Sequence, residues 1–267
     1  DSAADIALGI KAIVGEVRQR LPESKIVVLS VFPRNNPRTK GDFERVKAIN
    51  KLLPAIADNK RVFHVDINQS FLDESGQLRP EMFGKDLLHL AGAGYDAWYD
   101  ALKPILAEAG LKPMAAKAVV PAVKESKPAI SAVDAPIIRL WPIERVGGEQ
   151  NRLREEHRAR PNGSKQLCGV LDPNLTVYQA KSDKATPAVV YCPGGAYMIL
   201  DPQQPAIKWF NGQGITVFML KYTIPKNPDA AFEYIQRAMR LVRHQAKKWN
   251  IDPDAIGVVG NSAGAHL

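Results

Sequence analysis

The spacing of apolar residues divides the first part of the chain into alternating helical and extended segments. Apolar residues at positions 6, 10, 13, 14, 17 and 21 follow one face of a helix over residues 4–20. The run KIVVLSVF at 25–32 is rich in β-branched residues and bounded by charge and proline, which predicts a buried strand. The same criteria predict helices over 41–57 and 92–110 and a strand over 61–67. Alternation at this pitch indicates a parallel sheet with helices on its faces.

A second set of alternating elements fills the end of the chain. The last of its helices is the clearest, because its apolar residues share one face; they are Phe232, Ile235, Met239, Val242, Ala246 and Trp249. Residues 112–136, between the two sets, are rich in Ala, Lys and Pro without an amphipathic period, as is typical of a linker. The pattern predicts an α/β protein with two partial parallel-sheet domains, 1–111 and 137–267. The predicted elements of the second set are strands at 175–180, 186–192, 214–222 and 255–259 and helices at 203–212 and 229–249.

Composition narrows the function classes without selecting one. The 267 residues are 45% hydrophobic and 24% charged, as in ordinary globular proteins. The net charge is +8, but Lys and Arg are spread along helical stretches without a run of five or six like charges. We interpret them as solvated helix faces and expect no nucleic-acid partner.

Cysteine usage and the absence of targeting segments leave the compartment open. Cys168 and Cys192 are too few and too far apart for a disulfide framework or a metal site, and Cys192, inside an apolar run, is expected to be a buried free thiol. No stretch reaches the length of a membrane span, and no signal peptide is visible. Because the chain begins at Asp1 without Met, we expect it to be a segment of a longer polypeptide. A secreted or periplasmic location is a hypothesis.

The candidate chemistry of the second half centres on the sequence GNSAG at 260–264, directly after the last predicted strand. A serine hydroxyl becomes a good nucleophile when a sharp strand-turn-helix elbow holds it exposed beside a base and oxyanion-stabilising donors. Such a turn needs small residues two positions before and after Ser262, and both are glycine here. The double glycine at 194–195 ends another apolar strand, and its loop, with the amide of Ala263, could build an oxyanion hole. Two unrelated glycine turns remain the alternative.

Residues 172–267 resemble the N-terminal half of an α/β-hydrolase esterase, nearest to the acetyl-xylan-esterase and lipase-like carbohydrate esterases. The segments CPGGAY and VRHQAKKWNIDPDAIGVVGNSAGAHL carry this resemblance. The resemblance implies that Ser262 is the nucleophile and that the amides of Gly195, Ala196 and Ala263 form the oxyanion hole. Ala196 replaces a glycine of the family pattern, a small change that an amide donor tolerates.

The acid and the histidine of such a triad are not evident in this chain. In that fold both residues follow the serine along the sequence, and only three residues follow Gly264. His266 is too close in sequence to return as the base, and we expect it to be a helix residue under the elbow. His244 lies on the charged side of a predicted helix and is expected to be solvated.

The first half offers an aspartate and a histidine, Asp86 and His89, three positions apart in DLLHL before a predicted helix. Such a pair alone is usually a surface pair. With ALGIKAIVGEVRQRLPESKIVVLSVFPR and VFHVDINQSFLDESGQL, however, residues 1–110 resemble the C-terminal part of an SGNH (GDSL-like) hydrolase of the platelet-activating-factor acetylhydrolase type. The resemblance implies that His89 is the general base and that Asp86 sets its tautomer. The family's nucleophile and oxyanion blocks would lie before Asp1.

The two resemblances together imply the back half of one esterase joined to the front half of another. Residues 1–111 would be the C-terminal part of an SGNH domain, 112–136 the linker, and 137–267 the N-terminal part of an α/β-hydrolase domain that ends at the elbow. The implied activity is serine acyl transfer that removes acetyl groups from a polysaccharide or a small ester. No cofactor is implied, and no cluster of His, Cys, Asp and Glu has metal-ligand spacing.

Two alternatives remain open at this point. Ser262 could meet Asp86 and His89 in one hybrid triad, although each half was shaped for partners of its own fold. The chain could instead be a non-catalytic carbohydrate-binding or scaffolding module with tryptophans as sugar-stacking platforms. The candidates are Trp98, Trp209 and Trp249, which at helical spacing are more often core residues.

Overall fold

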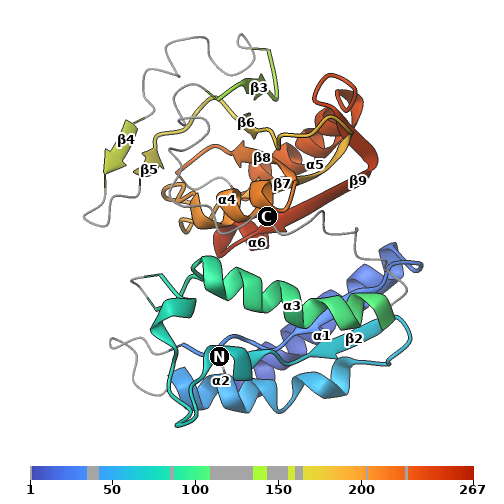
Figure 1. Ribbon diagram of the computed structural model, residues 1–267, viewed down its shortest axis with the longest axis vertical. Helices are drawn as coiled ribbons and strands as arrows, with labels where there is room; N and C mark the ends of the chain where they lie inside the picture. Colours follow the sequence, from blue (N-terminus) through green and yellow to red (C-terminus); the bar gives the residue numbers. More distant parts are fainter. Residues whose placement is uncertain are drawn as a thin grey trace. The chain divides into compact units, whose positions relative to one another are not determined.

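The chain divides into two compact units, Asp1–Ala116 and Lys117–Leu267 (Figure 1). The computed structural model describes residues 2–34, 42–84, 87–108, 135–142, 156–159, 165–202, 204–225 and 228–267. The predicted linker therefore lies almost wholly outside the described residues. Each unit combines helices with strands, so the predicted α/β class is confirmed.

The first unit, over the residues described, is built on two parallel strands. β1 and β2 pair in parallel with Ile26 opposite Val62. Ser2 starts α1 through a capping box, because its hydroxyl accepts a hydrogen bond from the Asp5 amide while the Asp5 carboxylate accepts one from the Ser2 amide. In chain order the elements are α1 (Ala3–Arg20), β1 (Ile26–Leu29), α2 (Asp42–Asn50), η1 (Leu53–Ile56), β2 (Val62–Val65), η2 (Asn68–Phe71), η3 (Pro80–Met82) and α3 (Gly92–Glu108).

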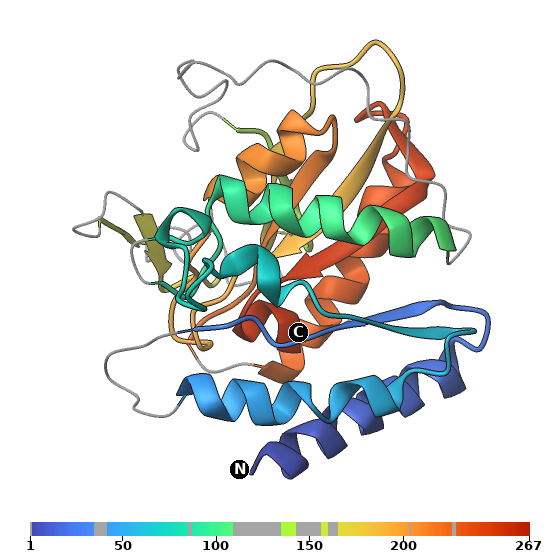
Figure 2. The same cartoon turned by 60° about the horizontal axis from the view of Figure 1, so that its bottom comes forward.

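Helices cover both faces of this strand pair. Val28 and Val62 point to one face and pack with Val14 of α1. Val65 points to the other face, in the cluster against which Trp98 of α3 packs. This division follows the alternation of side chains along a strand and explains why both segments are apolar throughout. Helices α1 and α2 lie side by side and share a further apolar cluster (Figure 2).

The second unit contains a five-stranded sheet in the order β3-β6-β8-β7-β9. β7 pairs in parallel with both β8 and β9, whereas β6 is antiparallel to β3 and β8. β4 and β5 form a separate antiparallel pair. In chain order the elements are β3 (Ile137–Arg139), β4 (Glu156–Ala159), β5 (Lys165–Cys168), β6 (Asn174–Tyr178), β7 (Thr186–Cys192), α4 (Gln204–Gly212), β8 (Thr216–Lys221), α5 (Pro228–His244), β9 (Ile251–Gly260) and α6 (Ala263–His266).

The core of the second unit lies on both faces of this sheet. On one face Val190 and Phe218 share a cluster with Val242 of α5. On the other face Val189 and Val217 and their neighbours pack with α4. Central strands that are buried on both sides need apolar residues at successive positions, which is why β7 and β8 appear as continuous apolar runs.

The structure corrects three details of the prediction. The sheet of the second unit is mixed, since β6 runs antiparallel to its neighbours. The helix predicted over 229–249 ends at His244, and turns follow it. Phe232 is 55% exposed, because Ala231 and Ala238 occupy the buried face of α5 together with Ile235. The short strands β3, β4 and β5 were not predicted at all.

A polar pair lies where β1 and β2 end in the first unit, with Ser30 buried and His64 half-buried. Ser30 is 2% exposed, and its hydroxyl oxygen lies 3.1 Å from Nε2 of His64. Burial lowers the pKa of His64, and the Asp66 carboxylate opposes that shift. The fold therefore favours the neutral imidazole.

This lowered pKa predicts a pH dependence of the stability of the first unit. In the unfolded chain His64 takes up a proton near pH 6.5, earlier than in the fold. The contribution of the neutral side chain to stability is therefore complete above about pH 6.5 and decreases as the pH falls below it. Hydrogen exchange of the β1 and β2 amides at pH 7.5 and 5.5, corrected for the intrinsic exchange rate, should show this loss in the wild type. His64→Gln, which does not titrate, should show less of it, and an equal loss in both proteins would contradict the prediction.

Candidate functional site

The two glycine-containing turns of the second unit lie side by side because their strands are parallel neighbours. β7 and β9 pair in parallel, and their last residues, Cys192 and Gly260, stand opposite each other. The loop at 193–201, called here the oxyanion loop, follows β7, and the turn at 261–264, called the elbow, follows β9. Parallel strands end at the same edge of a sheet, so the topology brings two segments about 70 residues apart in sequence into contact.

The elbow holds Ser262 in a conformation that an L-residue rarely adopts. Its backbone angles are φ 52° and ψ −127°, and the residue is exposed. The Gly264 amide donates to the Asn261 carbonyl and the Ala265 amide to the Ser262 carbonyl, both at 2.9 Å, which closes the turn into α6. Such backbone strain costs on the order of 1–3 kcal/mol and persists only where the surrounding structure enforces it.

Glycines make the close contacts that enforce this turn. A Cβ at Gly264 would lie 2.0 Å from the carbonyl oxygen of Cys192, and one at Gly260 would lie 2.3 Å from the carbonyl oxygen of Gly264. On the facing loop, a Cβ at Gly194 would lie 2.8 Å from the Cβ of Ser262. Real Cβ atoms do not approach other atoms this closely, so the elbow and the oxyanion loop meet backbone to backbone.

The oxyanion loop presents free amides beside the serine. Gly195, Ala196 and Tyr197 have φ values of 131°, 54° and 57°, three successive residues in the left-handed half of backbone space. Within the part of the chain that the structure describes, no hydrogen bond is found for the amides of Gly195, Ala196 and Ala263. The three predicted oxyanion-hole residues therefore lie on the two facing segments with unused donors.

Two buried residues, Tyr191 and Cys192, hold Asn261 of the elbow in place. This role was not predicted from the sequence. The Tyr191 hydroxyl donates to Oδ1 of Asn261 at 2.8 Å, and the Asn261 amide donates to the Cys192 carbonyl at 3.3 Å. Tyr191 is a β7 residue, so Asn261, the residue before Ser262, is held from the neighbouring strand. Cys192 is a buried free cysteine, as predicted, and burial raises the pKa of its thiol to about 12.

His244 is placed as predicted, whereas His266 is not. No hydrogen bond is found for the Ser262 side chain among the described residues. His244 is exposed at the end of α5, as predicted. His266 is exposed rather than packed under the elbow, and its Nδ1 lies 2.9 Å from the Tyr197 hydroxyl. The sequence offered no signal for this contact, because its two residues are 69 positions apart.

In the first unit His89 lies in a short loop that leads into α3, whereas Asp86 is outside the described residues. The Gly84 amide donates to the His89 carbonyl at 2.7 Å. Behind the loop, a Cβ at Gly94 would lie 2.3 Å from the Met82 carbonyl oxygen, so α3 packs tightly on the preceding turn. His89 is half-buried, at a position fixed by these contacts.

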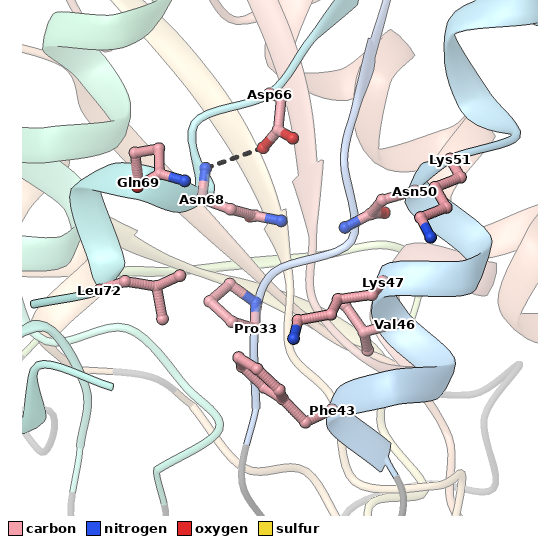
Figure 3. Close-up of a pocket in the computed structure, with 10 residues that line it drawn as sticks. All are labelled: Pro33, Phe43, Val46, Lys47, Asn50, Lys51, Asp66, Asn68, Gln69 and Leu72. Atoms are coloured by element: carbon pink, nitrogen blue, oxygen red, sulfur yellow. Dashed lines mark hydrogen bonds between the residues drawn. The ribbon is translucent and has the colours of Figure 1, made fainter. Parts of the chain in front are cut away.

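A pocket of about 300 Å³ opens in the first unit between α2, the segment after β1 and the start of η2 (Figure 3). Asn50 closes its inner end by bonding both the amide and the carbonyl of Val31, at 2.8 and 2.9 Å. His89 is not among the described residues that line it. These residues are Pro33, Phe43, Val46, Lys47, Asn50, Lys51, Asp66, Asn68, Gln69 and Leu72.

Among the described residues, the structure offers no metal-binding cluster, no membrane-spanning helix and no exposed ring at Trp249. In the described ranges no three His, Cys, Asp or Glu side chains gather as a metal would require. No helix there has the length and apolar character that a bilayer crossing demands. Trp249 is 8% exposed, with its ring edge-on to Phe218 in the core, so it is not available as a sugar platform.

The close contact at Gly264 predicts a large effect of a single methyl group. Gly264→Ala should destabilise the second unit by about 1–3 kcal/mol or more, because a backbone carbonyl must move to admit the Cβ. Gly257→Ala on β9 is the matched control, since its Cβ would meet only a Val189 methyl group at 3.8 Å. Denaturant unfolding of both variants measures the difference. Equal stability of the two variants would refute the packing argument.

Comparison with known proteins gives a separate match for each unit. Residues 1–97 match the model of the GDSL-like lipase/acylhydrolase family, and residues 175–267 match the BD-FAE model. An acetylxylan esterase of Xylanibacter ruminicola is 39% identical over 85 residues, which cover 30% of this chain and 18% of that protein. Platelet-activating factor acetylhydrolase IB subunit alpha2 of Rattus norvegicus is 34% identical over 99 residues, which cover 36% of this chain and 41% of that protein.

Among solved structures, an acetyl ester-xyloside bifunctional hydrolase from Caldicellulosiruptor lactoaceticus is 35% identical, with a TM-score of 0.37. The match covers 49% of this chain and 44% of that one. The chain thus spans less than half the length of each of these three proteins. Its first unit is thus similar to the GDSL-like lipase/acylhydrolase family over residues 1–97, and its second unit is similar to the BD-FAE model over residues 175–267.

Proposed function

We propose that residues 137–267 form the nucleophile-bearing half of an α/β-hydrolase esterase that removes acetyl groups from carbohydrate. The observation that carries the proposal is the geometry at Ser262, an exposed serine with φ 52° against which Gly194 of the neighbouring loop packs. An ordinary strand end does not need such a conformation, whereas a nucleophile elbow does. The match to the BD-FAE model over 175–267 supports the same assignment.

The proposed reaction is serine acyl transfer in two steps. The Ser262 oxygen attacks the carbonyl carbon of the acetyl ester, and the amides of Gly195, Ala196 and Ala263 stabilise the negative charge on the carbonyl oxygen. The tetrahedral intermediate expels the sugar hydroxyl and leaves an acetyl-serine, which water then hydrolyses to acetate. A histidine takes the serine proton, returns it to the leaving oxygen and then activates the water. In this proposal that histidine and its acid partner come from residues outside this sequence.

The first unit, residues 1–111, is proposed to be the base-bearing half of an SGNH esterase, joined through 112–136 to the second. His89 would accept the proton of a serine supplied from outside this sequence, and Asp86 would orient the imidazole. The tight loop that holds His89 and the match over 1–97 to the GDSL-like family support this role.

Acetylated polysaccharide is the proposed substrate class, with small acetyl esters as simpler substrates. The support is the relative named acetylxylan esterase, which shares 39% identity with this chain over 85 residues. Because that match covers only part of either protein, the acetylated sugar is proposed as the substrate class without a specific sugar or acetyl position.

The test uses the full polypeptide that contains this sequence, with p-nitrophenyl acetate and acetylated xylan as substrates. Ser262→Ala should remove acetate release from xylan, by at least about 10³-fold in kcat, because no other group at the elbow can form the acyl-enzyme. His89→Ala should lower only the turnover that depends on the first unit. The matched controls are Ser182→Ala and His244→Ala, both away from the elbow, and they should retain activity.

Each outcome distinguishes one arrangement. Undiminished deacetylation by Ser262→Ala would contradict the proposed nucleophile. Loss of the Ser262-dependent turnover in His89→Ala would favour the hybrid triad instead. Absence of ester hydrolysis in the wild-type polypeptide, together with retained binding to xylan, would favour the non-catalytic module.

A further inference from the structure

We propose that Tyr197 and His266 form a tether that sets the spacing between the oxyanion loop and the nucleophile elbow. The tether is a positioning device, and its catalytic consequence rests on the esterase function proposed above. Tyr197 belongs to the oxyanion loop, directly after the donors Gly195 and Ala196. His266 belongs to α6, the helix that begins at the third donor, Ala263.

The contact between the two side chains has two components. The Tyr197 hydroxyl oxygen lies 2.9 Å from Nδ1 of His266, which is hydrogen-bond distance. The two rings also meet edge to face, with centroids 5.9 Å apart and an interplanar angle of 88°. Burial, followed by the nearby Cys192, raises the pKa of Tyr197, so its hydroxyl stays protonated and available as a donor. Both residues are surface-accessible, yet neither is free to rotate without breaking this pair.

The Tyr197 ring also contacts a residue that binds the base of the same loop. Its ring lies 5.8 Å from the ring of Tyr222, a fully buried residue. The Tyr222 hydroxyl donates to the carbonyl of Pro193 at 2.7 Å. The chain of contacts from Pro193 through Tyr222 and Tyr197 to His266 therefore links the first residue of the oxyanion loop to the helix after the nucleophile.

The backbone of the loop shows why it needs such an anchor. Ala196 and Tyr197 both carry a Cβ and both have positive φ, at 54° and 57°. Two adjacent residues of this kind relax toward ordinary backbone angles unless side-chain contacts hold them. Within the loop, the Gly195 carbonyl accepts from the amides of Met198 and Ile199 at 3.0 and 3.1 Å. Those bonds close the turn, and the Tyr197 side chain adds a tie from the loop to α6 beyond the close backbone approach of Gly194 to Ser262.

The tether has a specific expected effect on catalysis. Oxyanion donors act on charge that develops in the transition state, so a displaced donor lowers kcat while the binding of the substrate is little changed. Tyr197→Phe keeps the ring stack and removes only the hydrogen bond. It should lower kcat by about 10-fold to 100-fold and change KM by less than about 2-fold, since small misplacement of catalytic groups has effects of that size.

The variants of the partner residue sharpen the test. His266→Ala should lower kcat at least as much as Tyr197→Phe, because it removes the ring contact as well as the hydrogen bond, and the double variant should be no worse than His266→Ala alone. His266→Asn places an amide oxygen where Nδ1 lies and should recover most of the activity. Tyr234→Phe is the control, because it deletes another tyrosine hydroxyl of the same unit, 3.4 Å from Thr223.

The experiment measures kcat and KM on p-nitrophenyl acetate and, in parallel, hydrogen exchange of the amides at 195–199 in the full polypeptide. Faster exchange in Tyr197→Phe and His266→Ala, but not in His266→Asn or Tyr234→Phe, is the expected result. Wild-type kcat and unchanged exchange in Tyr197→Phe would overturn the tether. Full turnover by Ser262→Ala would instead overturn the esterase proposal, and the exchange data would still decide whether the tether exists.

Discussion

The second unit depends on one backbone contact, the approach of Gly264 to the end of β7. No side chain fits between Gly264 and the Cys192 carbonyl, since a Cβ there would lie 2.0 Å from the oxygen. This contact brings the first turn of α6 against β7, and it forces the chain to reverse within the few residues after β9. The exposed serine, the strained backbone at Ser262 and the proximity of the oxyanion loop all follow from that reversal. A bulkier residue at 264 would push the elbow away from the oxyanion loop and would disrupt the proposed site.

Strain in the site is concentrated where the proposed chemistry needs fixed positions. Ser262, Ala196 and Tyr197 are three of the non-glycine residues with positive φ in the described part of the chain, and they lie on the two facing turns. Each costs on the order of 1–3 kcal/mol, which the packed sheet beneath must offset. In return, the amides of Gly195, Ala196 and Ala263, for which no hydrogen bond is found among the described residues, are available to an oxyanion and need no rearrangement when its charge develops.

Much of this arrangement could be predicted from sequence because it rests on local rules. The apolar runs of β7 and β8 and the small residues around Ser262 each satisfy a constraint that acts within a few positions. Features set by distant partners could not be predicted. Phe232 fits a helical apolar stripe, yet the neighbouring Ala231 faces the core, because the rotation of α5 is decided by the sheet on which it packs. The reversed direction of β6 and the bond from Tyr197 to His266 likewise depend on residues far apart in sequence.

The strands that were not predicted also depend on contacts that the local sequence does not show. β4 is exposed along its whole length, so no apolar pattern marks it, and only its pairing with β5 makes it a strand. In the first unit, the position of His89 follows from the loop before α3 and from the close packing of Gly94 in α3 on Met82, whereas its proposed partner Asp86 lies outside the described residues. The sequence thus indicates which residues are candidates for the site, but it does not predict the contacts that hold them.

The most direct test of the central claim is chemical labelling of the nucleophile. A fluorophosphonate probe added to the full polypeptide that contains this sequence should form a covalent adduct on Ser262, located by mass spectrometry of the peptide that carries it. Its appearance should parallel the loss of the proposed acetylesterase activity. Complete inhibition with Ser262 unmodified would contradict the account, because the elbow would then not be where the acyl group is transferred.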